Sequence, residues 1–369
     1  MSSPDVIEAP LPTPVSKPLY RLECSFEENA ASGPDFDGPF PPVPATPEKD
    51  FFGFPVASRL GVAASLVLNQ SWAETFSRLG FDLLTYKTIR SRRKLAHPAP
   101  NWLYPDQATV TGAKSAPMTL GDGLPADPLS ATAVGSIGMP SVAPEVWRRD
   151  IRATRAALRP GQVLIVSVVA TSLPGISRED FIADFCALAD EAVAAGAQVV
   201  ELNLSCPNVA KSEGELYLDT DFAAQIAGAV RARIGTVPLL VKIGAIEDDA
   251  KLDELLCALD PLIDGIAMIN APSRVLLDDK GDFAFGETRQ TAGMMGGVNF
   301  DIGLDCVKRA VAVIGARGLG LKVLAVGGVT TPERAKAYAD AGAYAVMGAS
   351  GLAWDPFLAI RTKRLFPGI

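Results

Sequence analysis

Histidine and paired cysteines are scarce in this sequence of 369 residues. It contains a single histidine, His97, so catalysis by a histidine-based triad and metal binding by several histidines are nearly excluded. Its five cysteines, at positions 24, 186, 206, 257 and 306, form no Cys-x-x-Cys pair, which argues against a zinc site or an iron–sulfur cluster within the chain. Dispersed cysteines in odd number fit a reducing cytoplasm. His97, in a polar loop, is expected to be structural or solvated.

Long hydrophobic runs and concentrated positive charge are also missing. No apolar run reaches the length of about 18 residues that a membrane span needs, and the N-terminus lacks the basic-then-apolar pattern of a signal peptide. The formal net charge is −8, and the one basic cluster, residues 90–94, is expected to be a solvated loop or a contact for a small anion. We therefore expect a cytoplasmic protein that binds neither membranes nor nucleic acid.

The chain divides into a proline-rich beginning and a regular remainder. Residues 1–50 predict an irregular extension that wraps a neighbouring surface or stays disordered. Residues 51–369 predict one domain in which short apolar strands alternate with amphipathic helices. After a short hairpin within 51–62, the strands are expected near 60–64, 81–85, 163–170, 198–204, 239–243, 265–269, 322–326 and 344–347, with the clearest helices at 72–79, 144–158, 178–195 and 222–234.

Eight alternating units predict the α/β class and, within it, a closed (β/α)₈ barrel with loop insertions at 88–143 and after the sixth strand. In such a barrel, functional groups lie in the loops at the carboxyl ends of the strands. Polar side chains at these ends are Ser65 (next to Ala64), Lys87, Asn203, Asn208, Lys242 and Asn270. Carboxamides suit a planar, amide-bearing ligand, and lysines suit an anion.

Glycine pairs follow the last two strands of the predicted barrel. Gly327-Gly328 and Gly348-Ala349 each precede a helix, and Gly296-Gly297 lies in the insertion after the sixth strand. Bare glycines let backbone N–H groups approach phosphate oxygens closely, and barrels commonly bind phosphate after strands seven and eight. These pairs therefore predict a phosphate site.

Cys206 differs from the other cysteines in its predicted position. Cys186, Cys257 and Cys306 lie in predicted helices and are expected to be buried, and Cys24 lies in the extension. Cys206 follows the fourth strand, between two asparagines. An accessible thiolate there could act as a general base.

The segment Glu201–Asn208, with the sequence ELNLSCPN, resembles the signature loop of the dihydroorotate dehydrogenase family in its soluble, cysteine-using class. Segments 136–140, 268–270, 296–298, 325–329 and 346–349 follow in the order of that family, so the similarity spans roughly 51–366. The catalytic part of dihydropyrimidine dehydrogenase shares this pattern.

The resemblance implies FMN at the barrel mouth and a homodimer. Cofactor contacts would come from Ala64, Ser65, Lys87, Asn203, Lys242, Asn270, Gly297, Gly327, Gly328, Gly348 and Ala349. Substrate contacts would come from Lys87, Gly138, Met139, Asn203, Asn208, Asn270 and Ala271. Cys206 would remove the C5 proton of a 5,6-dihydropyrimidine while the C6 hydride passes to flavin N5, with Lys87 and Lys242 assisting. The reaction implied is the oxidation of dihydroorotate to orotate in pyrimidine biosynthesis.

Two departures from the family pattern leave the substrate open. Gly135 and Ala271 stand where the family usually has an asparagine and a serine or threonine, and each lost hydrogen bond to a buried polar atom costs about 1–3 kcal/mol. A related enzyme acting on another cyclic amide is therefore the alternative. A non-catalytic flavin-binding relic is disfavoured because Cys206, Lys87 and Lys242 are retained.

The electron acceptor also stays open at this point. It could be a soluble molecule or a separate electron-transfer subunit. A quinone route is disfavoured, because residues 1–50 lack an apolar pair of helices that would dock on a membrane.

Overall fold

The computed structural model describes residues 10–111, 116–205 and 215–369. A closed ring of parallel strands forms the centre of the molecule, in the order β3-β4-β8-β9-β10-β11-β15-β16. Their bounds are β3 Leu60–Val62, β4 Leu83–Ile89, β8 Val163–Val168, β9 Val199–Asn203, β10 Leu239–Ile243, β11 Gly265–Met268, β15 Lys322–Val326 and β16 Ala345–Gly348. The predicted (β/α)₈ barrel is thus confirmed.

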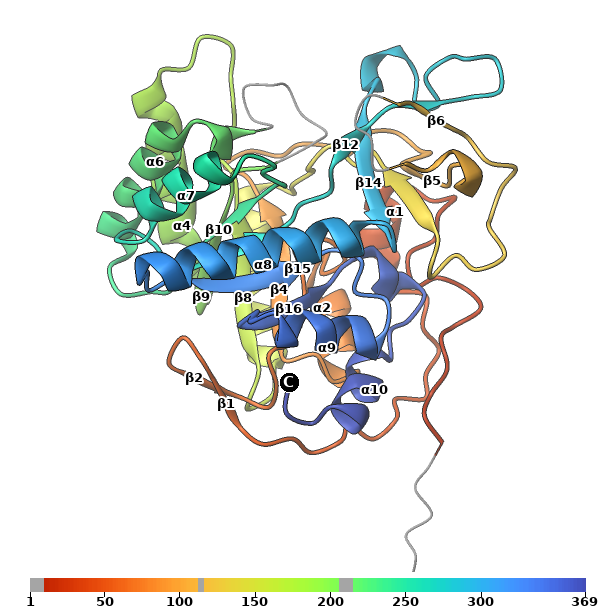
Figure 1. Cartoon of the computed structure of the whole chain (residues 1–369), viewed down its shortest axis with the longest axis horizontal. Coiled ribbons are helices and arrows are strands. Elements are labelled where there is room, and N and C mark those ends of the chain that lie inside the picture. Colours follow the sequence, from red (N-terminus) through yellow and green to blue (C-terminus); the bar gives the residue numbers. More distant parts are fainter. Residues whose placement is uncertain (1–9, 112–115, 206–214) are drawn as a thin grey trace, which may run out of the picture.

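A helix follows each strand and covers the outside of the ring (Figure 1). These are α2 Gln70–Arg78, α3 Pro144–Ala157, α4 Arg178–Ala195, α6 Thr220–Ile234, α7 Asp249–Leu259, α8 Asn299–Arg317, α9 Pro332–Asp340 and α10 Leu358–Leu365. Local sequence sets their ends. In α4, the Ser177 side chain accepts from the backbone N–H of Asp180, and Gly196 ends the helix with a φ of 122° that favours glycine.

Most predicted bounds agree with the structure to within a few residues. The second strand is the main exception, since β4 runs to Ile89 rather than ending at Thr85. A register shift between Tyr86 and Ile89 accommodates this extra length against β8. The polar residues Lys87 and Thr88 therefore belong to the strand itself, whereas Lys87 was expected just after its end.

Two hydrophobic layers hold the barrel together. The smaller one fills the inside of the ring and includes Leu83, Ile165, Leu240 and Met347. The predicted hairpin is present as β1 (Lys49–Phe51) and β2 (Phe54–Val56), and buried side chains of both strands join this inner layer. The larger layer lies between the strands and the surrounding helices.

The predicted irregular insertion 88–143 contains regular structure. It carries β5 (Trp102–Leu103), the short helix η1 (Gln107–Thr109), β6 (Met118–Thr119) and β7 (Thr132–Gly135). The insertion after β11 carries β12 (Ser273–Arg274), β13 (Leu276–Leu277), η3 (Glu287–Arg289) and β14 (Ala292–Gly296). Strands from the two insertions pair in a sheet of order β12-β14-β7-β5, seen above the barrel in Figure 1. Pairing between segments so far apart in sequence explains why the sequence did not reveal these strands.

The described part of the N-terminal extension packs on the barrel. The backbone N–H of Leu19 donates to the carbonyl of Ala353 at 2.8 Å. Leu19 and Tyr20 are both buried, and α1 (Phe26–Ser32) has a complete capping box made by Ser25. From residue 10 onward, the extension therefore follows the first alternative and wraps a surface, which is that of its own barrel.

Candidate active site

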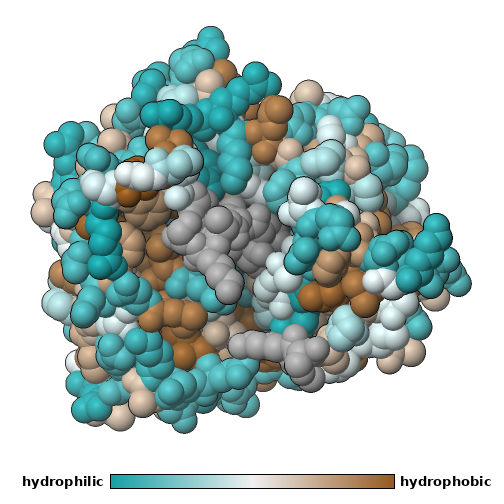
Figure 2. All heavy atoms as spheres, turned by 90° about the horizontal axis from the view of Figure 1, so that it is seen from above, coloured by the Kyte–Doolittle hydropathy of each residue, from teal (hydrophilic) through white to brown (hydrophobic). Residues whose placement is uncertain are grey.

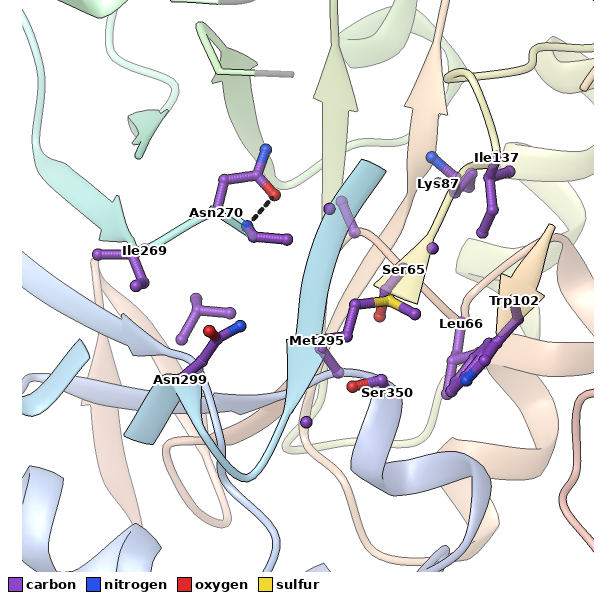
Figure 3. A pocket seen from close by; sticks show the side chains of 18 of the residues that line it. Ser65, Leu66, Lys87, Trp102, Ile137, Ile269, Asn270, Met295, Asn299 and Ser350 are labelled. Atoms are coloured by element: carbon purple, nitrogen blue, oxygen red, sulfur yellow. Dashed lines mark hydrogen bonds between the residues drawn. The ribbon is translucent and has the colours of Figure 1, made fainter. Parts of the chain in front are cut away.

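A deep pocket opens at the end of the barrel where the strands terminate. Hydrophobic residues are visible beside the hollow on this face, and the surface farther out is mostly hydrophilic (Figure 2). Figure 3 shows the pocket from close by. Its lining residues are Tyr20, Ala64, Ser65, Leu66, Leu68, Lys87, Trp102, Gly135, Ile137, Gly138, Met139, Asn203, Lys242, Ile269, Asn270, Ala271, Gly293, Met295, Gly296, Asn299, Val326, Gly327, Gly328, Ala349 and Ser350.

Most residues predicted for the site meet in this pocket. Those that line it are Ala64, Ser65, Lys87, Gly138, Met139, Asn203, Lys242, Asn270, Ala271, Gly327, Gly328 and Ala349. Gly297 and Gly348 lie just outside the lining. A Cβ on Gly348 would come within 2.7 Å of Leu352, so this glycine serves packing behind the pocket. Cys206 and Asn208 lie outside the described residues.

Asn203 and Lys242 stand side by side at the floor of the pocket. They are register partners on β9 and β10, and both are nearly fully buried. The Asn203 amide donates to Thr88 Oγ1 at 3.3 Å, and its Oδ1 accepts from the backbone N–H of Ser205 at 3.2 Å. The orientation of this amide is therefore fixed by protein groups alone.

Asn270 follows β11 and lies on the other side of the floor. Its side-chain nitrogen donates to the carbonyl of Ser205, and its Oδ1 accepts from the backbone N–H of Ala271 at 2.9 Å, the bond dashed in Figure 3. These contacts tie the end of β11 to the end of β9. The two carboxamides Asn203 and Asn270 thus reach the same pocket from strands two positions apart in the ring.

A cradle of small residues forms another wall of the pocket. Gly327 and Gly328 have φ angles of 130° and 60°, and a Cβ on Gly328 would lie 2.4 Å from the backbone nitrogen of Phe300. Their carbonyls accept from Tyr338 at 2.8 Å and Arg334 at 3.1 Å, both on α9. The two peptide units are therefore anchored to the helix, and no larger residue fits at position 328.

Asn299, at the start of α8, supplies a buried polar atom beside this cradle. Its Nδ2 donates to the carbonyl of Met294 at 2.6 Å, while its Oδ1 has no hydrogen-bond partner within the described part of the chain. Because buried polar atoms are nearly always paired, such an atom lining a pocket indicates a place for a donor group of a ligand.

Sequence reasoning missed the upper part of the pocket. Tyr20 comes from the extension, Trp102 from β5 and Met295 from β14. The rings of Tyr20 and Trp102 lie 5.8 Å apart, and the Tyr20 hydroxyl donates to Asn101 at 3.3 Å. These residues have no motif around them, and only the pairing of the insertions brings them to the barrel mouth.

Gly135, expected as a departure from the family pattern, lies under Met295. A Cβ added to Gly135 would be 2.7 Å from Cε and 2.9 Å from Sδ of Met295. The thioether therefore takes the space that a side chain at position 135 would need. This part of the pocket presents a methionine where the resemblance implied a carboxamide.

The basic cluster 90–94 does not behave as one solvated loop. Arg90 is 1% exposed, and its guanidinium donates to the carbonyls of Met139 and Ala170, each at 3.2 Å. The expectation of a solvated loop is wrong for Arg90 because the longer β4 carries it inside. There it holds the pocket segment that contains Gly138 and Met139.

His97 packs against the same segment. Its Nδ1 lies 3.1 Å from Ser136 Oγ, and a Cβ on Gly138, whose φ is 84°, would meet the imidazole ring at 2.6 Å. Burial, followed by the charges of Arg289 and Lys94, lowers the pKa of His97. These contacts give His97 a structural place beside the pocket.

The cysteines are less uniformly buried than expected. Cys306 is buried and Cys186 is half-buried, but Cys257 on α7 is exposed. The prediction for Cys257 is wrong because α7 turns Leu252, Leu255, Leu256 and Leu259 toward the core, and position 257 lies off that stripe.

Neither a metal centre nor a membrane span is found in the part of the chain that the structure describes. Across residues 10–111, 116–205 and 215–369, no group of three or more His, Cys, Asp or Glu side chains is placed to hold a metal ion. The helices in these ranges are all too short or too polar to cross a bilayer.

Barrel and pocket together define an α/β-barrel protein with a ligand site at the strand ends, and comparison with known proteins agrees. The family model described as dihydroorotate dehydrogenase matches residues 124–364. A dihydroorotate dehydrogenase of Dictyostelium discoideum is 33% identical over 371 residues, covering 94% of this chain and 97% of that protein. A putative dihydroorotate dehydrogenase A (fumarate) of Solibacter usitatus is 28% identical over 62% of this chain and 69% of its own length.

A crystal structure of DHODH from Eimeria tenella in complex with ferulenol has the same fold. It superposes with a TM-score of 0.70 at 18% identity, covering 92% of this chain and 88% of that one. The chain belongs to the dihydroorotate dehydrogenase family. It is accordingly an oxidoreductase acting on CH–CH bonds.

Proposed function

We propose that the protein is an FMN-dependent enzyme that oxidises a 5,6-dihydropyrimidine, with dihydroorotate giving orotate as the first candidate. The observation that carries the proposal is the meeting of Lys87, Lys242, Asn203 and Asn270 with the glycine cradle in one pocket. The names of the relatives support the substrate.

The pocket residues fit FMN. The Gly327-Gly328 turn offers backbone to a phosphate without side chains in the way, and the α9 N-terminus that follows favours an anion. Asn299 Oδ1 is a buried acceptor without a protein partner in the described chain. Lys242 places a positive charge at the floor, where it would stabilise the negative charge of a reduced flavin ring.

FMN, when bound, would supply the acceptor for the hydride from C6 of the substrate. The protein would supply the base, and we assign that role to Cys206, which follows Ser205 in the sequence. Lys87, together with the 138–139 segment held by Arg90, would bind a substrate carboxylate. Asn203, Asn208 and Asn270 would bind the ring amides.

A second candidate is a related enzyme acting on another cyclic amide. It is favoured by one specific observation, the thioether of Met295 in place of a side chain at Gly135. Ala271 likewise offers no side-chain hydrogen bond. A substrate with an apolar edge at this point would suit the pocket better than one with an amide there.

For the second half-reaction, we propose a soluble acceptor or a separate electron-transfer subunit. The name of the Solibacter relative points to fumarate among soluble acceptors. We further propose a cytoplasmic homodimer, the compartment being suggested by the free thiols of Cys24, Cys186, Cys257 and Cys306.

The test is anaerobic reduction of the purified protein by dihydroorotate, dihydrouracil and NAD(P)H in parallel. The first candidate predicts a yellow protein whose flavin absorbance bleaches with dihydroorotate. Bleaching by another cyclic amide alone would establish the second candidate. A protein that contains no flavin after purification and takes up none when FMN is added would refute both candidates.

Cysteine variants test the base. Cys206→Ala is expected to bind flavin but to lower the rate of bleaching by at least about 10²-fold, the usual contribution of a general base. Cys257→Ala is the matched control, because this thiol is exposed on α7. Equal rates for the two variants would exclude Cys206 as the base.

A further inference from the structure

A buried carboxyl group lies beneath the pocket and has no role so far. Glu201 on β9 is 4% exposed and lies two residues before Asn203, facing Ser167 across the β8–β9 ladder. It does not line the pocket. One of its oxygens, Oε1, lacks a hydrogen-bond partner among the described residues. A buried acid in the middle of a barrel is costly unless other groups compensate its charge.

A chain of hydrogen bonds joins this carboxyl to the pocket. Asn203 Nδ2 donates to Thr88 Oγ1 at 3.3 Å, and Thr88 Oγ1 donates to Ser167 Oγ at 3.0 Å. Ser167 in turn hydrogen-bonds Glu201. In this chain each group donates its proton to the next group on the way to Glu201. A carboxylate can only accept hydrogen bonds, so this direction of donation is the one it requires.

The same direction of donation explains the orientation of Asn203. Because the Thr88 hydroxyl donates its one proton to Ser167, its oxygen can only accept a hydrogen bond from the Asn203 side chain. The amide must therefore turn Nδ2 toward Thr88 and Oδ1 toward the N–H of Ser205. The hydrogen-bond chain thus links the Asn203 amide to the carboxyl group two residues earlier on the same strand.

Two lysines act electrostatically on this carboxyl, Lys242 from the adjacent strand β10 and Lys87 from β4, which is two strands away in the ring. Burial raises the pKa of Glu201 above its ordinary value, and Lys242, the hydrogen bond from Ser167 and Lys87 oppose this rise and favour the carboxylate. Two ammonium groups against one carboxylate leave the floor positive by one charge rather than two. Such a floor attracts an anionic ligand without holding it as strongly as two uncompensated lysines would.

We propose that Glu201 is a positioning residue of the active site, which orients the Asn203 amide through Ser167 and Thr88 and offsets part of the positive charge of Lys87 and Lys242 beneath the flavin. This inference rests on the proposed binding of FMN. Its consequence is a lower flavin potential, so that the reduced enzyme passes its electrons on to the acceptor more readily.

The test compares flavin potentials of the full-length, FMN-loaded protein. In Glu201→Gln a negative charge is lost, which favours the reduced, anionic flavin. We expect the equilibrium between oxidised and reduced flavin to shift about tenfold or more toward the reduced form, about +30 mV for a two-electron couple. Anaerobic titration against a reference dye measures it. Glu254→Gln, on the exposed face of α7, is the control that should leave the potential unchanged.

A second variant separates orientation from charge and does not depend on the stability of the first. Ser167→Ala breaks the chain but keeps the carboxylate. We expect about a fivefold rise in KM for the reducing substrate, equivalent to one ordinary hydrogen bond, with kcat nearly unchanged and a smaller shift of the flavin potential than in Glu201→Gln.

The outcomes distinguish this inference from the proposed function. A flavin-loaded Glu201→Gln protein with an equilibrium within twofold of the wild type overturns the charge role alone. An unchanged KM in Ser167→Ala overturns the orienting role. A wild-type protein that binds no flavin overturns both the inference and the proposed function.

Discussion

Met295 and Gly135 together offer the sharpest test of how this pocket selects its substrate. Gly135 lies on β7, opposite Gly293 of β14 and Trp102 of β5, so its backbone is fixed by strands on both sides. A Cβ there would lie 2.7 Å from Met295 Cε. An asparagine at position 135 therefore fits only if the end of the thioether moves away, and Met295→Ala provides that space.

The expected effects follow from these contacts. Gly135→Asn alone forces the flexible methionine aside, and we expect kcat/KM for dihydroorotate to fall about tenfold because the displaced thioether enters the pocket. In Gly135→Asn/Met295→Ala, the new carboxamide reaches the substrate ring. One added hydrogen bond to an otherwise unpaired polar atom is worth about 1–3 kcal/mol, or roughly 5- to 150-fold in kcat/KM. The double variant should therefore exceed the wild type with this substrate.

A double-mutant cycle measured by stopped-flow bleaching of the flavin under anaerobic conditions gives the coupling directly. Met295→Ala alone is the fourth corner of the cycle and controls for the lost thioether. The steric reasoning is refuted if the two substitutions are additive, or if Gly135→Asn alone improves the reaction as much as the pair does.

Three further predictions concern cofactor binding, pH and the extension. Gly328→Ala places a Cβ 2.4 Å from the Phe300 nitrogen at a φ of 60°, so the purified protein should lose most of its flavin, as its absorbance ratio would show. Burial raises the pKa of Asp355, the partner of Arg361, to about 6, so between about pH 4 and 6 the folded state holds more protons than the unfolded state. As the pH rises from about 4 to 6, the free energy of unfolding of the wild type should therefore fall by roughly 2–3 kcal/mol relative to that of Asp355→Asn. Urea titrations in which this difference stays flat or rises with pH would contradict the prediction. Tyr20→Ala should lower the free energy of unfolding by about 3 kcal/mol, and no loss would mean that the extension is not part of the core.

The barrel and the floor of the site could be predicted from the sequence because both follow from regular patterns. Apolar runs of about four to eight residues between amphipathic helices define the strands, and a parallel barrel places the next polar residues at one mouth. Asn203, Lys242 and Asn270 were found in this way. Their positions depend only on the strand to which they belong.

The upper wall of the pocket could not be predicted, because no regular local pattern leads to it. Trp102 and Met295 reach the pocket because β5, β7 and β14 pair across about 190 residues of sequence. The strands involved have two to five residues, too few to show a period. Such pairings are determined by tertiary packing, which local propensity does not encode.

Arg90 and Glu201 show a further limit, which concerns charge. In the sequence, a run of cations suggests a solvated loop, and no local pattern marks Glu201 as a buried acid beside the site. In the structure, both are buried beside the pocket, where Arg90 holds the Met139 carbonyl and Glu201 faces two lysines. Burying a charge is unfavourable unless polar partners surround it, so the partners of both groups have to be sought beside the pocket. For Glu201, the charged groups that act on it are Lys242 and Lys87, and both line the pocket. A change in substrate is therefore expected to arise in the insertions, at Gly135 and Met295, while the charges beneath the pocket stay as they are.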